Sequence, residues 1–149
     1  MDLKTPAFLK LEHKQLHSQL AEATRAGGNI GEAARTVART WRLHFVKEEE
    51  YAFPPLRLLP LLAQGTATTE MAEAFVMTDR LKAELNQMLE EHREIVAALT
   101  NLINVAKQEN KIEYVKFAER LVLHAKSEEE VLYPAAILVG EYLRFKLKK

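Results

Sequence analysis

Apolar residues recur at intervals of three and four along most of the chain. This spacing predicts one buried face on each of four helices, at about residues 3–25, 31–52, 69–107 and 111–132. No comparable run alternates apolar and polar residues, as a half-buried strand would. Short turns at GGN and QEN make sequential helices antiparallel neighbours. The pattern therefore predicts an all-α, up-down-up-down four-helix bundle that occupies residues 1–149 as a single domain.

The second and fourth predicted helices end in the same motif. HFVKEEEYAFP begins at His44 and HAKSEEEVLYP begins at His124, and the two share the histidine, three glutamates, an aromatic residue and a proline. A shift of about eighty residues also places LEHKQL over EEHREI in the first and third helices. The bundle is therefore predicted to be a duplicated two-helix unit. Because proline disfavours helix at the preceding residue, each motif helix should stop or bend there, with a shorter helix following.

The predicted buried faces are apolar except at positions that repeat one chemistry. These positions are His13, His44, Glu48, His92, His124 and Glu128. A step of four residues turns a helix by about 400°, so each motif histidine and its glutamate project from nearly the same face. Buried carboxylates and imidazoles destabilise a core unless a partner compensates their charge and lone pairs, and a metal cation does so. The sequence therefore predicts a metal site in the core of the bundle.

Cysteine is absent from the chain, which excludes disulfides, thiolate-bound iron–sulfur clusters and zinc fingers within it. The metal donors must then be nitrogen and oxygen, for which iron, manganese and zinc are acceptable. The 21 basic residues balance the 21 acidic ones, which argues against binding to nucleic acid or an anionic membrane. No uninterrupted apolar segment of about 18 residues occurs, so the expected location is the cytoplasm.

Two features leave alternatives open. His17 lies one turn after His13, and its counterpart in the second half is Val96, so His17 is either an additional ligand or a histidine at the edge of the bundle. The remaining motif glutamates rotate away from the buried face. They are expected to be solvated, with hydrogen bonding to the metal ligands as the alternative; they are Glu49, Glu50, Glu129 and Glu130.

The His-x-x-x-Glu pairs in the second and fourth helices, with a histidine inside the first and third, resemble the hemerythrin-like family of HHE cation-binding domains. The resemblance covers nearly the whole chain and implies two non-haem irons, with manganese or zinc as substitutes. It also implies that Glu48 and Glu128 bridge the irons. By analogy, one iron would be held by His13, His17 and His44, and the other by His92 and His124. The second iron would then keep an open position for a small ligand.

With this resemblance, the favoured function is a protein that binds or senses a small diatomic ligand such as O2 or NO, or that handles iron, without turning over an organic substrate. The alternative is a di-iron oxidase or peroxidase, or an iron donor for repair of iron–sulfur clusters. A metal-free helical interaction module is a third interpretation. Glu-x-x-His is missing, unlike in ferritin-like oxidases, and so is the His-Glu-x-x-His of zinc metalloproteases. No protein partner is indicated by the sequence.

Overall fold

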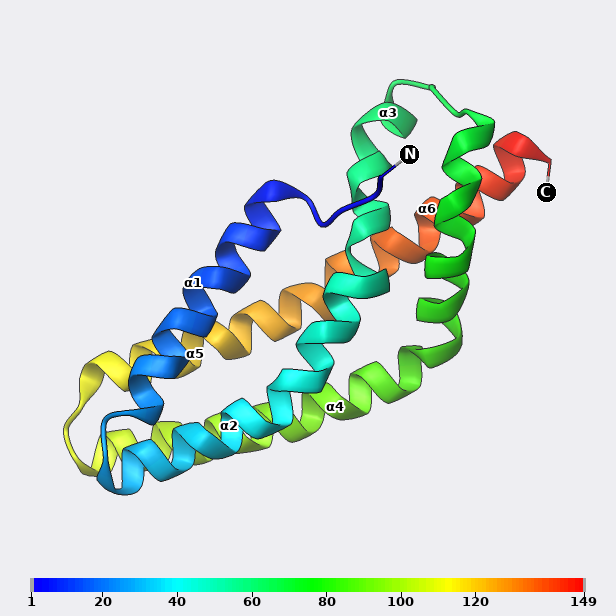
Figure 1. The fold of residues 1–149 in the computed structure, drawn as a ribbon. Coiled ribbons are helices and arrows are strands. Elements are labelled where there is room, and N and C mark those ends of the chain that lie inside the picture. Colours follow the sequence, from blue (N-terminus) through cyan, green and yellow to red (C-terminus); the bar gives the residue numbers. More distant parts are fainter. Residues whose placement is uncertain (1, 149) are drawn as a thin grey trace.

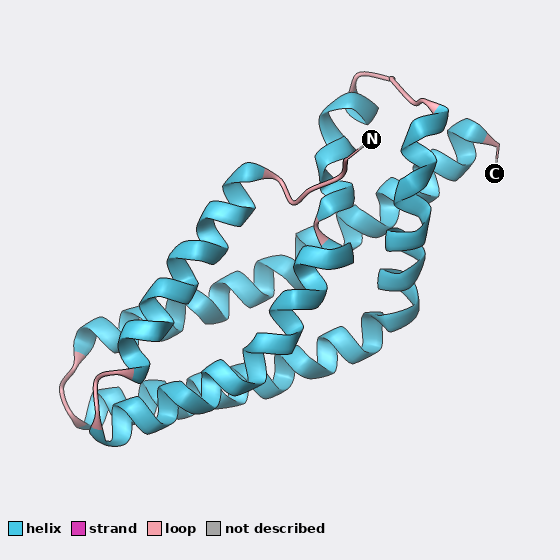
Figure 2. Ribbon diagram, viewed as in Figure 1, coloured by secondary structure: helices cyan, strands magenta, loops and turns pink. Residues whose placement is uncertain are grey.

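The structure, a computed structural model, describes residues 2–148 and consists of helices joined by short loops (Figures 1 and 2). The α-helices are α1 (Ala7–Thr24), α2 (Gly28–Lys47), α3 (Leu59–Ala63), α4 (Ala74–Gln108), α5 (Ile112–Ser127) and α6 (Tyr133–Leu147). Shorter helical turns are η1 (Glu48–Ala52), η2 (Pro54–Leu58), η3 (Thr69–Glu73) and η4 (Glu128–Leu132). No strand occurs within these residues, so the all-α prediction is confirmed.

Four helices form the bundle. In Figure 1, α1, α2, α4 and α5 run side by side, while α3, α6 and the first part of α4 continue beyond one end of the bundle. The predicted helix boundaries agree with these elements to within a few residues. The first helix begins later than expected, because Pro6 precedes it with an extended backbone. The second begins earlier, directly after Gly27, whose φ of 77° suits glycine.

Both repeated motifs contain a π-helical turn that begins at the buried glutamate. The backbone N–H of Phe53 donates to the carbonyl of Glu48 at 2.9 Å, and that of Tyr133 donates to the carbonyl of Glu128. Each of these bonds spans five residues rather than the usual four. The following proline has no N–H and would clash with the carbonyl four residues earlier, which the wider turn accommodates.

The proline in each repeat is thus followed by further helix, as the sequence predicted. At Pro54 the chain continues into η2 and α3, whereas at Pro134 it continues directly into α6. The two halves of the duplication therefore diverge after their motifs.

Two apolar clusters enclose the polar centre of the bundle. The first fills one end of the bundle and includes the fully buried Leu16, Leu99 and Leu102. The second lies near the motif prolines and includes Tyr51 and Met88. Burying a leucine or methionine side chain contributes about 1.5–3 kcal/mol, so these clusters stabilise the helices on both sides of the polar residues.

A third cluster joins α3, α4 and α6, where the helices approach closely at Gly140 and Thr78. A Cβ atom at Gly140 would lie 2.2 Å from Thr78 Oγ1, so this crossing depends on glycine. No helix among residues 2–148 is both long and apolar enough to cross a membrane.

Candidate metal centre

The four bundle helices bring six polar side chains together in the core. All are buried, and the most exposed of them, His124, is 7% exposed. They are His13 from α1, His44 and Glu48 from α2 and η1, His92 from α4, and His124 and Glu128 from α5 and η4. All six side chains therefore lie in the interior, as their spacing along the helices predicts.

One group of potential metal ligands consists of His44, Glu48, His92 and Glu128. His44 Nε2 lies 3.2 Å from Glu48 Oε2, and His92 Nε2 lies 3.0 Å from Glu128 Oε1. One donor atom from each of the four residues lies within 4.8 Å of every other. A single cation could contact all four.

A second group consists of His13, His124 and Glu128. The Nε2 atoms of the two histidines are 3.2 Å apart, and Glu128 Oε2 lies 2.9 Å from that of His124. Glu48 Oε1 is 3.8 Å from His13 Nε2, and it is a buried oxygen without a hydrogen-bond partner among residues 2–148. An orphaned, buried carboxylate oxygen near the Nε2 atom of His13 fits a site for a cation.

Glu128 belongs to both groups, and Glu48, a member of the first, directs its other oxygen toward a histidine of the second. Glu48 directs Oε2 toward His44 and Oε1 toward His13. Glu128 directs Oε1 toward His92 and Oε2 toward His124. Each carboxylate thus has one oxygen near a histidine of each group.

The histidines are paired differently from the expectation. The analogy paired His13 with His44, and His92 with His124, whereas the structure pairs His13 with His124 and His44 with His92. Spacing along one helix shows which residues face inward. It does not specify which imidazole each meets across the core, because that depends on how each helix is rotated about its own axis.

Each of the four core histidines also contacts a carboxylate on its outer side, at Nδ1. Glu49 lies 3.0 Å from His13, Glu91 lies 2.8 Å from His44, and Glu129 lies 3.0 Å from His92. Glu12 contacts His124 in the same way. The set follows the duplication, since Glu12 and Glu91 each precede a helix histidine, whereas Glu49 and Glu129 each follow a motif glutamate.

These contacts correct the expectation that Glu49 and Glu129 are solvated, and they support the alternative of hydrogen bonding to the ligands. Glu50 and Glu130 are exposed, as expected. Glu12 and Glu91 were missed, although the repeated Glu-His pair in LEHKQL and EEHREI marks them.

The outer carboxylates orient the imidazoles. An ionised carboxylate can only accept hydrogen bonds, so each imidazole in its neutral form carries its hydrogen on Nδ1 and directs the Nε2 lone pair inward. Six carboxylates surround four imidazoles here, and Lys47 pairs with Glu91 at 2.7 Å. This excess of negative charge favours a bound cation.

Protons can neutralise the centre when metal is absent. Burial alone would lower the pKa of His13 and His92, but Glu128 and Glu48 outweigh it and raise these pKa values to about 9 and about 10. The pKa values of His44 and His124 are raised in the same way, against burial, by Glu48 and Glu128 respectively. Burial opposes ionisation of Glu128, but hydrogen bonds from His124, His13 and His92 hold its pKa well below the usual range. Metal and protons therefore compete for these atoms.

His17 lies outside both groups. Its ring stacks on Trp41 at 4.3 Å between centroids and packs edge-on against Phe45 at 4.1 Å. The side chain is half-buried, and burial, with the nearby His13, lowers its pKa. Its Nε2 makes no hydrogen bond to the described residues. The structure thus places His17 in an aromatic layer one helical turn beyond the centre.

Tyr133 lies among the buried donors, although its sequence position did not predict it as a site residue. Its hydroxyl donates to Glu48 Oε2 at 2.5 Å and lies 2.9 Å from His44 Nε2 and 3.0 Å from His92 Nε2. Burial, then the charges of Glu48 and Glu128, raise the pKa of Tyr133 well above its usual range. The available signal was its place in the repeat, where the first half has Phe53.

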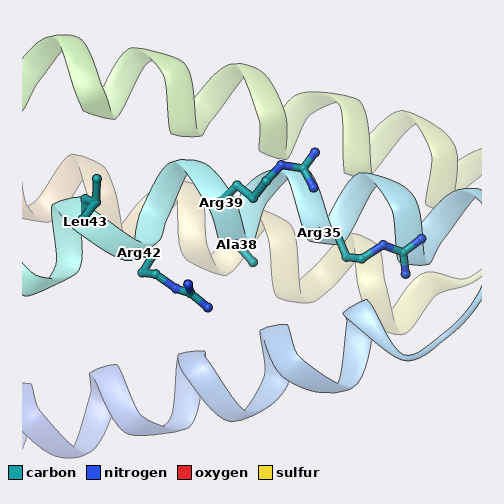
Figure 3. A pocket seen from close by; sticks show the side chains of 5 residues that line it. All are labelled: Arg35, Ala38, Arg39, Arg42 and Leu43. Atoms are coloured by element: carbon teal, nitrogen blue, oxygen red, sulfur yellow. The ribbon is translucent and has the colours of Figure 1, made fainter.

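A surface pocket of about 590 Å³ runs along α2 and is separate from this centre. Its lining is Arg35, Ala38, Arg39, Arg42 and Leu43 (Figure 3). The three guanidinium groups point in different directions, and that of Arg35 donates to the carbonyl of Thr24. None of the six buried ligand candidates lines this pocket, and their burial places the candidate metal centre in the core of the bundle.

Comparison with known proteins agrees with the geometry. The family model described as the hemerythrin HHE cation-binding domain matches residues 5–136, which include every residue of the two groups. Neither the curated proteins nor the solved structures gave a match to this chain. The matched segment spans most of the chain, and its buried histidines and glutamates could hold a metal ion. The chain belongs to the family of hemerythrin HHE cation-binding domains.

Proposed function

We propose that the protein binds two non-haem iron ions, one at each group, with Glu48 and Glu128 bridging them. The observation that supports this most directly is the division of each carboxylate's oxygens between the groups. Nitrogen and oxygen donors without sulfur suit iron, and manganese or zinc could substitute for it. The orphaned Glu48 Oε1 would gain a partner at the second metal.

The function proposed for this centre is binding or sensing of a small diatomic ligand, O2 or NO. Iron supplies the ability to bind such a molecule at a vacant coordination position. The protein contributes a buried site enclosed by the apolar clusters, which would exclude bulky substrates. The outer glutamates hold the four imidazoles with Nε2 facing the metals, so the ligands do not need to reorganise.

Metal analysis of protein purified without added metal tests the proposal, together with optical spectra before and after exposure to air and to NO. Two irons per chain and a spectrum that changes with the gas are expected. Glu128→Ala should not retain two irons, while Glu130→Ala, on the exposed side of the same turn, should. Protein without bound metal, or two tightly held irons in Glu128→Ala, would contradict the proposal. Steady turnover of an organic substrate would instead indicate an enzyme.

A further inference from the structure

The two metal groups differ at one position that the duplication makes equivalent. Phe53 and Tyr133 both directly precede the motif proline, and both side chains are fully buried. The Phe53 ring lies 5.3 Å from the His13 ring, whereas Tyr133 extends its hydroxyl among the donors of the other group. The side of the centre that contains His44 and His92 therefore has one more oxygen atom than the side that contains His13 and His124.

The distances from this oxygen to its neighbours match those between ligands of one metal. Nitrogen and oxygen atoms about 2.1 Å from one metal, at right angles to each other, are about 3.0 Å apart. Tyr133 Oη lies 2.9 Å and 3.0 Å from the Nε2 atoms of His44 and His92, and 2.5 Å from Glu48 Oε2. The donors of the group show similar separations, such as 3.0 Å between His92 Nε2 and Glu128 Oε1.

The hydrogen bonds of Tyr133 Oη depend on whether His44 and His92 are protonated. The phenol donates its one hydrogen to Glu48, so when the inward Nε2 atoms are deprotonated, as metal binding requires, its oxygen faces them with lone pairs only. A cation among these atoms would use all of the lone pairs. The negative charges of Glu48 and Glu128 favour the protonated phenol, whereas the positive charge of a bound cation would favour the phenolate.

We propose that Tyr133 Oη is a direct ligand, as phenolate, of the metal held by His44 and His92. This inference rests on the proposed function, since it requires a metal at that group. Phenolate is an established protein ligand for iron. Binding forms the metal–oxygen bond and releases the phenolic proton to solvent, as metal binding does at other protonated ligands.

The two metals would then be chemically distinct. The metal of His44 and His92 gains a fifth protein ligand, whereas that of His13 and His124 faces the carbon ring of Phe53 and gains none. The position for an external small ligand would therefore be at the metal held by His13 and His124. The two metals would differ because Tyr133 in the second half corresponds to Phe53 in the first half. The difference between His17 and Val96, the other unlike pair of the duplication, would not be its source.

Iron(III)-loaded protein provides a test, because phenolate bound to iron(III) gives a visible charge-transfer band with tyrosine ring vibrations in resonance Raman spectra. We expect this band in the unmodified protein and its loss in Tyr133→Phe. The matched control is Tyr51→Phe, which removes a buried tyrosine hydroxyl that bonds Glu84 instead, and this variant should keep the band.

Iron content measured on the same samples separates the two proposals. Unmodified protein with two irons and no phenolate band would overturn the assignment of Tyr133 while leaving the metal centre intact. The same conclusion follows if the band persists in Tyr133→Phe. Unmodified protein without iron would contradict the proposed function itself. If Tyr133→Phe fails to fold, the Raman spectrum of unmodified protein containing ring-deuterated tyrosine still shows whether phenolate binds the iron.

Discussion

The metal-free protein should lose stability as the pH rises from about 6.5 to about 9. In the folded protein the pKa values of His13 and His92 are about 9 and about 10, against 6.5 for an unperturbed imidazole. A group with a higher pKa in the folded state contributes its full stabilisation below the unfolded pKa. That contribution is lost as the pH rises through the folded pKa. Protonated histidines thus stabilise the metal-free protein only on the acid side of this range.

The magnitude follows from the pKa shifts. One pKa unit corresponds to about 1.4 kcal/mol. If His13 and His92 titrate independently, deprotonation of each between pH 6.5 and 9 lowers the free energy of unfolding by up to about 3 kcal/mol. The raised pKa values of His44 and His124 act in the same direction. Glu128, with its lowered pKa, contributes stability above pH 4.5 that is lost on further acidification through its folded pKa. The metal-free protein should therefore be most stable between about pH 4.5 and 6.5.

Urea unfolding of chelator-treated protein, followed by circular dichroism at several pH values, measures this change. Iron or zinc retention should show the opposite trend, because the metal binds deprotonated ligands and its affinity rises with pH. His92→Gln should reduce the pH dependence of the metal-free protein, while His17→Leu, outside the centre, should preserve it. A metal-free protein that is equally or more stable at about pH 9 than at about pH 6.5 would refute this account of the centre.

Three further predictions concern single positions. Glu129→Gln should weaken metal binding by about 10–100-fold, because it weakens the hydrogen bond that orients His92. The exposed Glu130→Gln should leave the affinity unchanged. Equal metal affinities of the two variants in a metal-buffer titration would contradict this role of Glu129. His17→Leu should retain two metals by elemental analysis, and loss of one metal would instead identify His17 as a ligand. Gly140→Ala should destabilise the protein by about 1–3 kcal/mol because its Cβ would overlap Thr78; an unchanged Tm would show that the crossing of α4 and α6 adapts freely.

The sequence alone determined the four bundle helices, the duplication and the six buried histidines and glutamates. These features depend on local relations, because the spacing of apolar residues sets the face of a helix and a four-residue step keeps His44 with Glu48 and His124 with Glu128. The repeat added independent support, since polar residues at core positions in both halves require a shared explanation. The presence of a metal-binding core could therefore be predicted without coordinates.

Only the tertiary structure decided how these residues meet across the core. The pairing of His13 with His124 depends on the rotation of α1 and α5 about their axes, which one-dimensional spacing does not specify. The contact between Glu91 and His44 joins residues on different helices and also depends on side-chain rotamers. Tyr133 appeared in the sequence as an aromatic residue of the motif, and its hydroxyl became part of the centre only because the π-helical turn and packing direct it toward Glu48.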